Sequence, residues 1–226
     1  MTTLVIATRN RHKADEIRAI LGASVQGLTL NEFPGAPPLV EDADTFAGNA
    51  ARKAEQLARW LRTIPSFEFR VSSSNGFVLA DDSGLEVDAL GCAPGVYSAR
   101  FAAMDAGAEG NSSDAANNAK LLRLLAEVPM DRRTARFRCA LALVSLGPDA
   151  KAREARLFEG TCEGRISFAP SGAGGFGYDP LFVPNGFTES FAELGESVKN
   201  QLSHRARALA KLREWLERTG ATHGVR

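Results

Sequence analysis

Residues 80–101 read ADDSGLEVDALGCAPGVYSARF and directly follow the apolar run Phe77, Val78, Leu79. The apolar run predicts a buried β-strand over residues 76–80, and the two aspartates and the serine are then expected just past its carboxyl end. Open α/β sheets usually bind their ligands at that edge. Paired carboxylates there suit a magnesium ion, whereas an Asp-Ser-Gly turn that caps the next element fits the same residues.

Predicted strands and helices alternate on both sides of this stretch. Apolar residues predict a strand at 3–7, helical spacing follows it up to Gly22, and a second helix begins after a proline-rich loop with Thr45 as its N-cap. The remaining expected elements are a helix that ends before Pro129, a strand over residues 134–146, a hairpin partner after GPD, and a last helix between Ser203 and Gly220. This order predicts an α/β protein with a mixed sheet.

The composition excludes several classes of protein. With 226 residues we expect one domain, and because 27 basic side chains balance 27 acidic ones we expect no stable nucleic-acid binding. No stretch approaches the roughly 18 apolar residues of a membrane span, and the start MTTLVIATRNRHK lacks the order of a signal peptide, so we expect a cytoplasmic protein without a membrane anchor. Cys92, Cys139 and Cys162 lie too far apart for a zinc or disulfide pattern and are interpreted as plain thiols.

Two polar segments in the first part of the chain are candidate sites. TRNRHK, residues 8–13, lies at a strand-to-helix junction, where free backbone N–H groups and Lys13 favour an anion; a solvated helix start is the alternative. Glu41 and Asp42 add carboxylates in the proline-rich loop. A metal site assembled from this loop and the aspartates of residues 80–101 is therefore plausible.

Two further segments follow near the end of the chain. GAGGFGYDP, residues 172–180, has four glycines that let the backbone approach a ligand and two aromatic faces, although a loose surface loop fits it equally. His204 and Arg205 are expected in the first turn of the last helix, with Lys199 upstream. Cations at that end oppose the helix dipole, so either an anionic partner is present or they are ordinary surface charge.

Taken together, TRNRHK, EDADTFAGNA, the 80–101 stretch, GGFGYDPLFVP and SHRARAL resemble the inosine triphosphate pyrophosphatase family over nearly the whole chain. That family hydrolyses non-canonical purine nucleoside triphosphates to the monophosphate and pyrophosphate. The resemblance implies an α/β fold with a long curved mixed central sheet, two lobes flanking a substrate cleft within a single domain over residues 1–226, and a homodimer.

The resemblance also implies roles for individual residues. Asp82 is the implied general base, and Glu41 and Asp82 are the implied ligands of Mg²⁺. The implied substrate-binding residues are Thr8, Asn10 and Lys13 in the first motif, Ser83 beside the base, Phe176, Gly177, Tyr178 and Asp179 around the purine, and Lys199, His204 and Arg205 at the far wall.

Two departures from the family pattern leave alternatives open. Arg9 occupies the usual glycine position of the first motif, where it either tightens phosphate binding or points to solvent. EDADTF replaces the commoner Glu-Glu-Thr-Gly pattern, so the second metal ligand is either Glu41 or Asp42.

Rival functions use parts of the same pattern. A nucleotide sensor would share the phosphate and aromatic segments but has little need of an acidic cluster, and an enzyme for pyrimidine or modified nucleotides would share the chemistry. We expect hydrolysis between the α and β phosphates. Selectivity requires a donor that faces the oxygen at purine position 6, and the FGYD backbone and the segment around His204 and Arg205 are expected to supply it.

Overall fold

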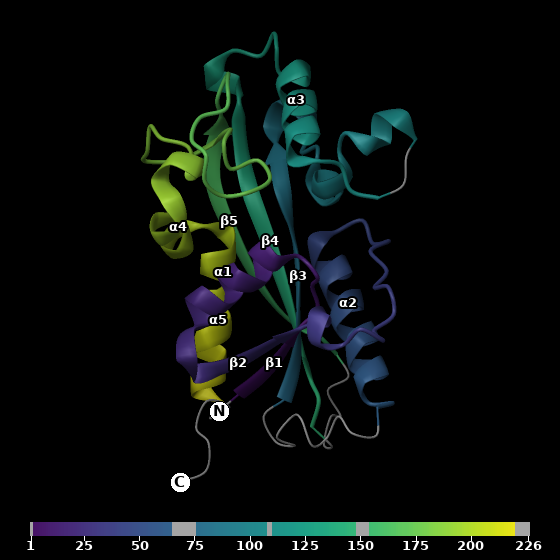
Figure 1. The fold of residues 1–226 in the computed structure, drawn as a ribbon. Helices are drawn as coiled ribbons and strands as arrows, with labels where there is room; N and C mark the ends of the chain where they lie inside the picture. The colour runs from purple at the N-terminus through teal and green to yellow at the C-terminus, as the bar shows by residue number, and fades with distance from the viewer. Residues whose placement is uncertain (1, 65–75, 108–109, 148–153, 220–226) are drawn as a thin grey trace. The chain divides into compact units, whose positions relative to one another are not determined.

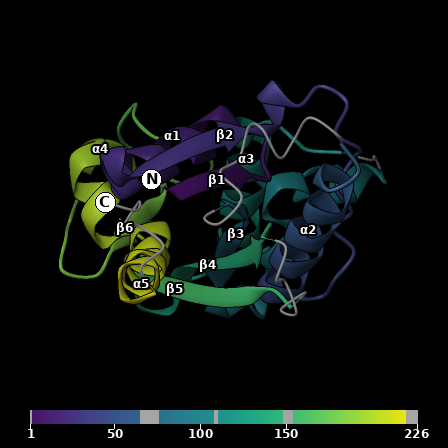
Figure 2. The same cartoon turned by 90° about the horizontal axis from the view of Figure 1, so that it is seen from below.

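The computed structural model describes residues 2–64, 76–107, 110–147 and 154–219. Within these residues a six-stranded sheet has the strand order β2-β1-β3-β4-β5-β6 (Figures 1 and 2). The strands are β1 (Thr2–Ile6), β2 (Val25–Thr29), β3 (Gly76–Val87), β4 (Thr134–Ser145), β5 (Arg156–Ile166) and β6 (Phe182–Pro184). The α-helices are α1 (Arg11–Leu21), α2 (Phe46–Leu61), α3 (Asp114–Leu124), α4 (Phe191–Leu202) and α5 (His204–Arg218).

The sheet combines parallel and antiparallel strand pairs. β1 runs parallel to both of its neighbours, β2 and β3. The end of β4 returns to the start of β3, where Leu146 N donates to Gly76 O at 2.9 Å, and β5 pairs with β6 in the antiparallel direction. The predicted α/β class with a mixed sheet is confirmed, while most of the turn expected at GPD lies outside the described residues.

The chain divides into two compact units. Unit 1 comprises residues 1–82, 140–159 and 207–226, and unit 2 comprises residues 83–139 and 160–206. Because the boundaries fall inside β3, β4, β5 and α5, these elements supply residues to both units. The substrate cleft and the homodimer that the resemblance implies stay predictions.

In unit 1, helices cover the parallel strands on both sides. β1 is buried along its whole length, as expected for a strand with neighbours on both edges and helices on both faces. Figures 1 and 2 show α1 and α5 on one side of β1 and β3, and α2 on the other. The predicted cap of α2 is confirmed, since Thr45 Oγ1 accepts from Gly48 N at 3.0 Å, and the apolar stripe that follows it is buried.

The strand predicted to end at Ala80 continues to Val87. The expectation that Asp81, Asp82 and Ser83 lie past the end of a strand was therefore wrong, and so was the alternative that they form a turn. They occupy the middle of β3, between β1 and β4 in the sheet order. Charge does not end this strand, because each carboxylate meets a lysine from a neighbouring helix.

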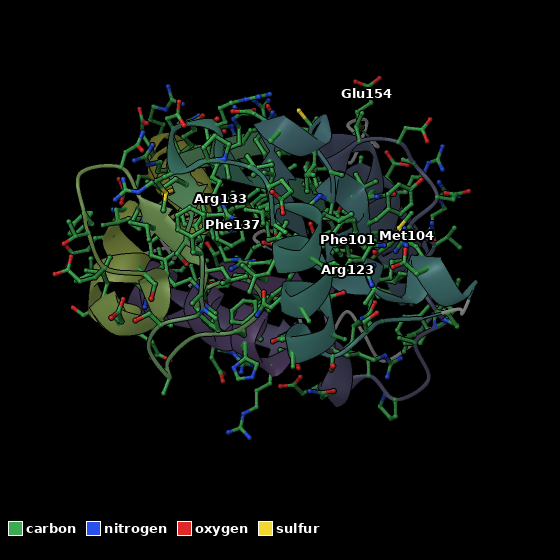
Figure 3. The ribbon with its side chains drawn as sticks, turned by 90° about the horizontal axis from the view of Figure 1, so that it is seen from above. Phe101, Met104, Arg123, Arg133, Phe137 and Glu154 are labelled. Atoms are coloured by element: carbon green, nitrogen blue, oxygen red, sulfur yellow. The ribbon has the colours of Figure 1, made fainter. Side chains whose placement is uncertain are left out.

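Unit 2 has its own aromatic core. The Phe137 ring of β4 lies 4.6 Å from the ring of Phe182 and stacks on His204 at 4.8 Å, measured between centroids. The same buried cluster includes Leu85, Val87, Phe101, Leu121, Leu125, Ile166, Tyr178 and Phe191; Phe101 and Phe137 are labelled in Figure 3. Residues from β3, β4, β5, α3 and α4 therefore share one core with the loop that carries Tyr178.

The cysteines behave as expected. Cys139 and Cys162 are buried, Cys92 is exposed, and none of the three forms a disulfide bond. In the part of the chain that the structure describes, no helix combines the length and the apolar character that crossing a bilayer requires.

Arg133, labelled in Figure 3, is a buried cation that binds backbone oxygens. Its guanidinium donates to Val128 O at 2.9 Å, to Leu125 O at 2.6 Å and to Ser167 O at 2.8 Å. The ring of Phe168 lies 4.1 Å from its central carbon. Arg133 thus ties the end of α3 to the segment that follows β5.

Replacing Arg133 by Met keeps an apolar chain of similar reach but removes donors from three backbone oxygens. We expect the free energy of unfolding to fall by about 3 kcal/mol, because each orphaned buried acceptor costs roughly 1 kcal/mol or more. Urea denaturation measures the loss. The exposed neighbour Arg132→Met serves as the control, and a similar loss in both variants would contradict the assigned role.

Candidate functional site

Two carboxylates follow one another in the middle of β3, and each has its own lysine. Lys13 of α1 donates to Asp81 Oδ1 at 2.6 Å, and Lys53 of α2 donates to Asp82 Oδ1 at 3.0 Å. Consecutive side chains of a strand point to opposite faces, and Figures 1 and 2 show α1 and α2 on opposite sides of β3. Two separate cations therefore offset the repulsion between the neighbouring aspartates.

The candidate site of unit 1 is the group of polar side chains around Asp82, and the ammonium group of Lys53 lies at its centre. Its side chain is only 5% exposed. Besides Asp82 it donates to Glu41 Oε1 at 3.0 Å and to the backbone oxygen of Asp81 at 2.7 Å. Asn49, one turn earlier on α2, donates its amide to Asp82 Oδ2 at 3.2 Å. Both carboxylate oxygens of Asp82 are thus held by α2.

Burial and neighbouring charges determine the protonation states of Asp82 and Lys53. Burial raises the pKa of Asp82, and this effect outweighs the lowering by Lys53 and Lys13. Burial acts to lower the pKa of Lys53, but the charges of Asp82, Glu41 and Asp81 together hold that pKa above its ordinary value. Lys53 therefore stays charged at neutral pH, and Asp82 binds a proton more tightly than an exposed aspartate does.

The structure separates the two acidic residues that the sequence left as alternatives. Glu41 shares the ammonium of Lys53 with Asp82, whereas Asp42 pairs with Arg52, and both of those side chains are about half exposed or more. Glu41 is therefore the better candidate for a second ligand beside Asp82.

The donor set fits a divalent cation that is shared with a substrate. Glu41, Asp81 and Asp82 carry three negative charges against the two positive charges of Lys13 and Lys53, which leaves a net charge of minus one. Among the described residues, no three or more His, Cys, Asp or Glu side chains are grouped closely enough to hold a metal ion by themselves. Magnesium needs only one or two protein carboxylates when water and phosphate complete its shell.

The first motif forms the junction between β1 and α1. Asn10 is the N-cap of α1, since its Oδ1 accepts from Lys13 N at 3.2 Å, and Thr8 Oγ1 accepts from Asn10 N at 3.1 Å. The side chain of Arg9 donates to Ala36 O at 3.1 Å, so it holds the proline-rich loop. The segment is a capped helix start with Lys13 turned to Asp81, and its role as an anion site stays a prediction.

In unit 2, a buried ion pair organises the glycine-rich loop. Lys199 of α4 donates to Asp179 Oδ2 at 2.6 Å, and these side chains are 4% and 2% exposed. The same oxygen accepts from Phe176 N at 2.8 Å, and the ammonium lies 4.3 Å from the Phe176 ring centroid. Tyr178 is buried and donates its hydroxyl to Ser98 O at 2.9 Å.

Close packing explains the glycines of this loop. A Cβ at Gly175 would overlap the carboxyl group of Asp179, and a Cβ at Gly172 would approach the backbone of Ala192 within 2.6 Å. Both glycines also have positive φ angles, of 72° and 82°. Residues 172–175 do lie at the surface, as the surface-loop alternative has it, but the backbone of the loop packs closely against the first turn of α4.

The start of α5 completes the unit 2 site. Arg205 is 1% exposed, donates to Ser83 Oγ at 2.9 Å and lies 5.9 Å from the Phe176 ring centroid. His204 is also buried and stacks on Phe137. Neither residue is ordinary surface charge, and unit 2 brings Ser83, Phe176 and Arg205 together, although they are far apart in the sequence.

Sequence reasoning missed Lys53 and Asn49. They are four residues apart, and both lie next to positions of the apolar stripe of α2, at Ala50 and Ala54. A lysine and an asparagine on the buried face of an amphipathic helix need polar partners, which is the signal that would have found them.

Replacing Lys53 by Met removes the cation that Glu41 and Asp82 share. We expect the free energy of unfolding at pH 7 to fall by about 3 kcal/mol, since the variant leaves a buried carboxylate without its ion pair. Urea denaturation measures this. Lys211→Met is the control, because Lys211 is exposed and its ammonium binds the backbone oxygen of Glu159; equal losses in the two variants would argue against the buried network.

Comparison with known proteins finds full-length relatives. The dITP/XTP pyrophosphatase of Rhodopirellula baltica is 48% identical over 210 residues, which cover 92% of this chain and 90% of that protein. The dITP/XTP pyrophosphatase of Geobacillus kaustophilus is 46% identical over 222 residues, with 97% of each chain covered. That of Shouchella clausii is 43% identical over 217 residues, with 96% and 98% covered.

Solved structures and a family model agree with these relatives. The Ham1 protein of Staphylococcus aureus superposes with a TM-score of 0.76 at 34% identity, covering 96% of this chain and 100% of that one. A HAM1 protein from Coxiella burnetii has the same TM-score at 33% identity, with 96% and 100% covered. The model of the Ham1 family matches residues 4–215. The resemblance seen in the motifs is confirmed, and the chain belongs to the Ham1 family.

Proposed function

We propose that the protein hydrolyses non-canonical purine nucleoside triphosphates, those of inosine and xanthosine and their deoxy forms, to the monophosphate and pyrophosphate. This keeps deaminated purines out of DNA and RNA. The observation that carries the proposal is the 43 to 48% identity to relatives named dITP/XTP pyrophosphatase, over 92 to 97% of this chain. The charged groups of both units support it.

Unit 1 offers what cleavage of a triphosphate requires. The reaction needs cations on the phosphate oxygens, a positioned water and a stabilised leaving group. The N-terminus of α1 favours an anion, and the ammonium of Lys13 has three N–H donors, so it can bind a phosphate oxygen while it keeps its contact with Asp81. Lys13 and Asn10 are therefore the proposed triphosphate ligands.

Glu41 and Asp82 are the proposed ligands of a magnesium ion. The net charge of minus one over the three carboxylates and two lysines supports this. A second support is that Glu41 and Asp82 both contact one cation, the ammonium of Lys53. Magnesium, when bound, supplies neutralising charge to the triphosphate and lowers the pKa of bound water.

Asp82 is the proposed acceptor of the proton from the attacking water. Before a metal binds, burial raises the pKa of Asp82 and so strengthens it as a base. Lys53 and Asn49 hold its two oxygens, so the orientation of the carboxylate is set before the substrate arrives. Preorganisation of this kind lowers the barrier because no reorientation is needed during the reaction.

Unit 2 is the proposed binding site for the purine, with Phe176 as the stacking ring and Ser83, Tyr178 and His204 in support. Three backbone N–H groups of FGYD already donate inside the protein: Phe176 to Asp179, Gly177 to Asp114, and Asp179 to Phe176 O. We therefore propose that a side chain, and not the FGYD backbone, donates a hydrogen bond to the oxygen at purine position 6. Arg205 is the strongest candidate for this donor. Adenine would place an amino group against that donor and be rejected.

The proposal also covers the oligomeric state of the enzyme, its location in the cell and its lack of nucleic-acid binding. We propose a homodimer that acts in the cytoplasm on free nucleotides and forms no stable complex with nucleic acid. The balance of 27 basic and 27 acidic residues supports the last point, since a nucleic-acid surface is usually basic.

Asp82→Asn tests the proton acceptor. Asparagine has nearly the same shape but no basic oxygen, so we expect kcat with inosine triphosphate to fall by about a hundredfold or more. Asp44→Asn, an exposed residue of the neighbouring loop, is the control with unchanged kcat. Circular dichroism checks that both variants are folded, and near-normal turnover of Asp82→Asn would remove that role.

Product analysis tests the reaction and its metal. Inosine, xanthosine, guanosine and adenosine triphosphates are each incubated with magnesium or with a chelator, and the nucleotide products are separated. We expect monophosphate and pyrophosphate from the inosine and xanthosine forms only, and only with magnesium. Diphosphate and phosphate would contradict the assigned bond, and tight binding without any product would favour a nucleotide sensor.

A further inference from the structure

Helix α3 contacts the FGYD segment at Gly177. Asp114 Oδ2 accepts from Gly177 N at 2.7 Å, and Asn118 Nδ2 donates to Gly177 O at 3.0 Å. These contacts lie within unit 2. The two peptide groups that flank the Cα of Gly177 are therefore both bound by side chains of one helix.

The spacing of Asp114 and Asn118 makes this double contact possible. They are four residues apart, so they lie one turn apart on the same face of α3. The helix itself is well anchored: Ser113 caps it, and the buried Asn117 accepts from Ala102 N at 2.9 Å. The acceptor and the donor are thus presented to Gly177 from a fixed element.

Glycine adopts positive and negative φ angles about equally, so contacts are needed to hold Gly177 in one conformation. Its φ angle is 63°, in the left-handed region that favours glycine. A Cβ at this position would meet no atom within 4 Å, so space does not require the glycine and only the backbone conformation does. On the other side of the turn, Asp179 holds Phe176 N, and Lys199 holds Asp179. The turn is therefore held by two sets of side chains, the ion pair of Asp179 with Lys199 of α4, and Asp114 with Asn118 of α3.

We propose that Asp114 and Asn118 are positioning residues for purine recognition: they hold Gly177 in its left-handed conformation and so set the direction of the Phe176 ring. This inference rests on the proposed function of the FGYD segment. Both residues belong to unit 2, whereas the groups assigned to the triphosphate belong to unit 1. Their loss is therefore expected to weaken substrate binding and to leave the step of bond cleavage largely intact.

Steady-state kinetics with inosine triphosphate test the proposal. Asp114→Ala should raise KM about tenfold and Asn118→Ala about threefold, with kcat within about twofold of the wild type, since a hydrogen bond to a charged acceptor is the stronger one. Glu127→Ala, an exposed carboxylate just after α3, is the control with unchanged KM. Unchanged KM in both test variants, or a fall in kcat without a rise in KM, would overturn the proposal.

A conservative variant separates the hydrogen bond from the helix charge. Asp114 is the acidic residue in the first turn of α3, where negative charge also stabilises the helix. Asp114→Asn loses that charge but keeps an oxygen for Gly177 N, so we expect its KM to rise only about threefold. A rise in KM as large as that of Asp114→Ala would assign the effect to charge and contradict positioning.

Hydrogen exchange gives a readout that does not depend on activity. The amide of Gly177 should exchange faster in Asp114→Ala than in the wild type or in Glu127→Ala, as followed by mass spectrometry of peptides that contain residues 176–179. If the wild type hydrolyses no purine triphosphate, the proposed function fails, and the exchange result still judges the contact itself. Unchanged exchange in both Asp114→Ala and Asn118→Ala would refute the inference whatever the activity.

Discussion

The burial of two aspartates in the middle of β3 is the constraint on which the rest of unit 1 depends. A buried carboxylate is costly unless a cation and hydrogen bonds compensate it. Lys13 and Lys53 supply that compensation from helices on the two sides of the strand. The positions of α1 and α2 and the polar residues on their inner faces are thereby linked to one dipeptide, Asp81-Asp82.

A buried carboxylate paired with a lysine also occurs in unit 2, where it holds a loop in place. The buried pair of Asp179 and Lys199 holds a loop that has little regular structure of its own, and the carboxylate also fixes the backbone at Phe176. Glycines let this loop pack tightly on α4, and α3 holds it at Gly177. The loop that carries Phe176 is thus held in one conformation by an ion pair and hydrogen bonds, where apolar contacts alone would leave several conformations open.

Much of the fold was predictable because its signals are local. Apolar runs, helical spacing and caps such as Thr45 predicted most helices and strands, and the alternation of elements predicted the mixed sheet. The end of β3 was predicted wrongly, because the rule that charge ends a buried strand ignores partners from elsewhere in the chain. Lys53 was missed for the same reason: its carboxylate partners are 12 and 29 residues away along the chain.

The sequence by itself determined the fold class, the family motifs and the kinds of group available for chemistry, since these depend on residue type, order and short-range spacing. Only the tertiary structure decided which groups meet. In the structure Asp81 pairs with Lys13, and Asp82 pairs with Lys53. Glu41, and not Asp42, shares Lys53 with Asp82, and Arg9 donates to Ala36. The physical reason is that a buried charge is satisfied by whichever partner the packing of distant elements brings within about 3 Å, and spacing along the chain does not encode that distance.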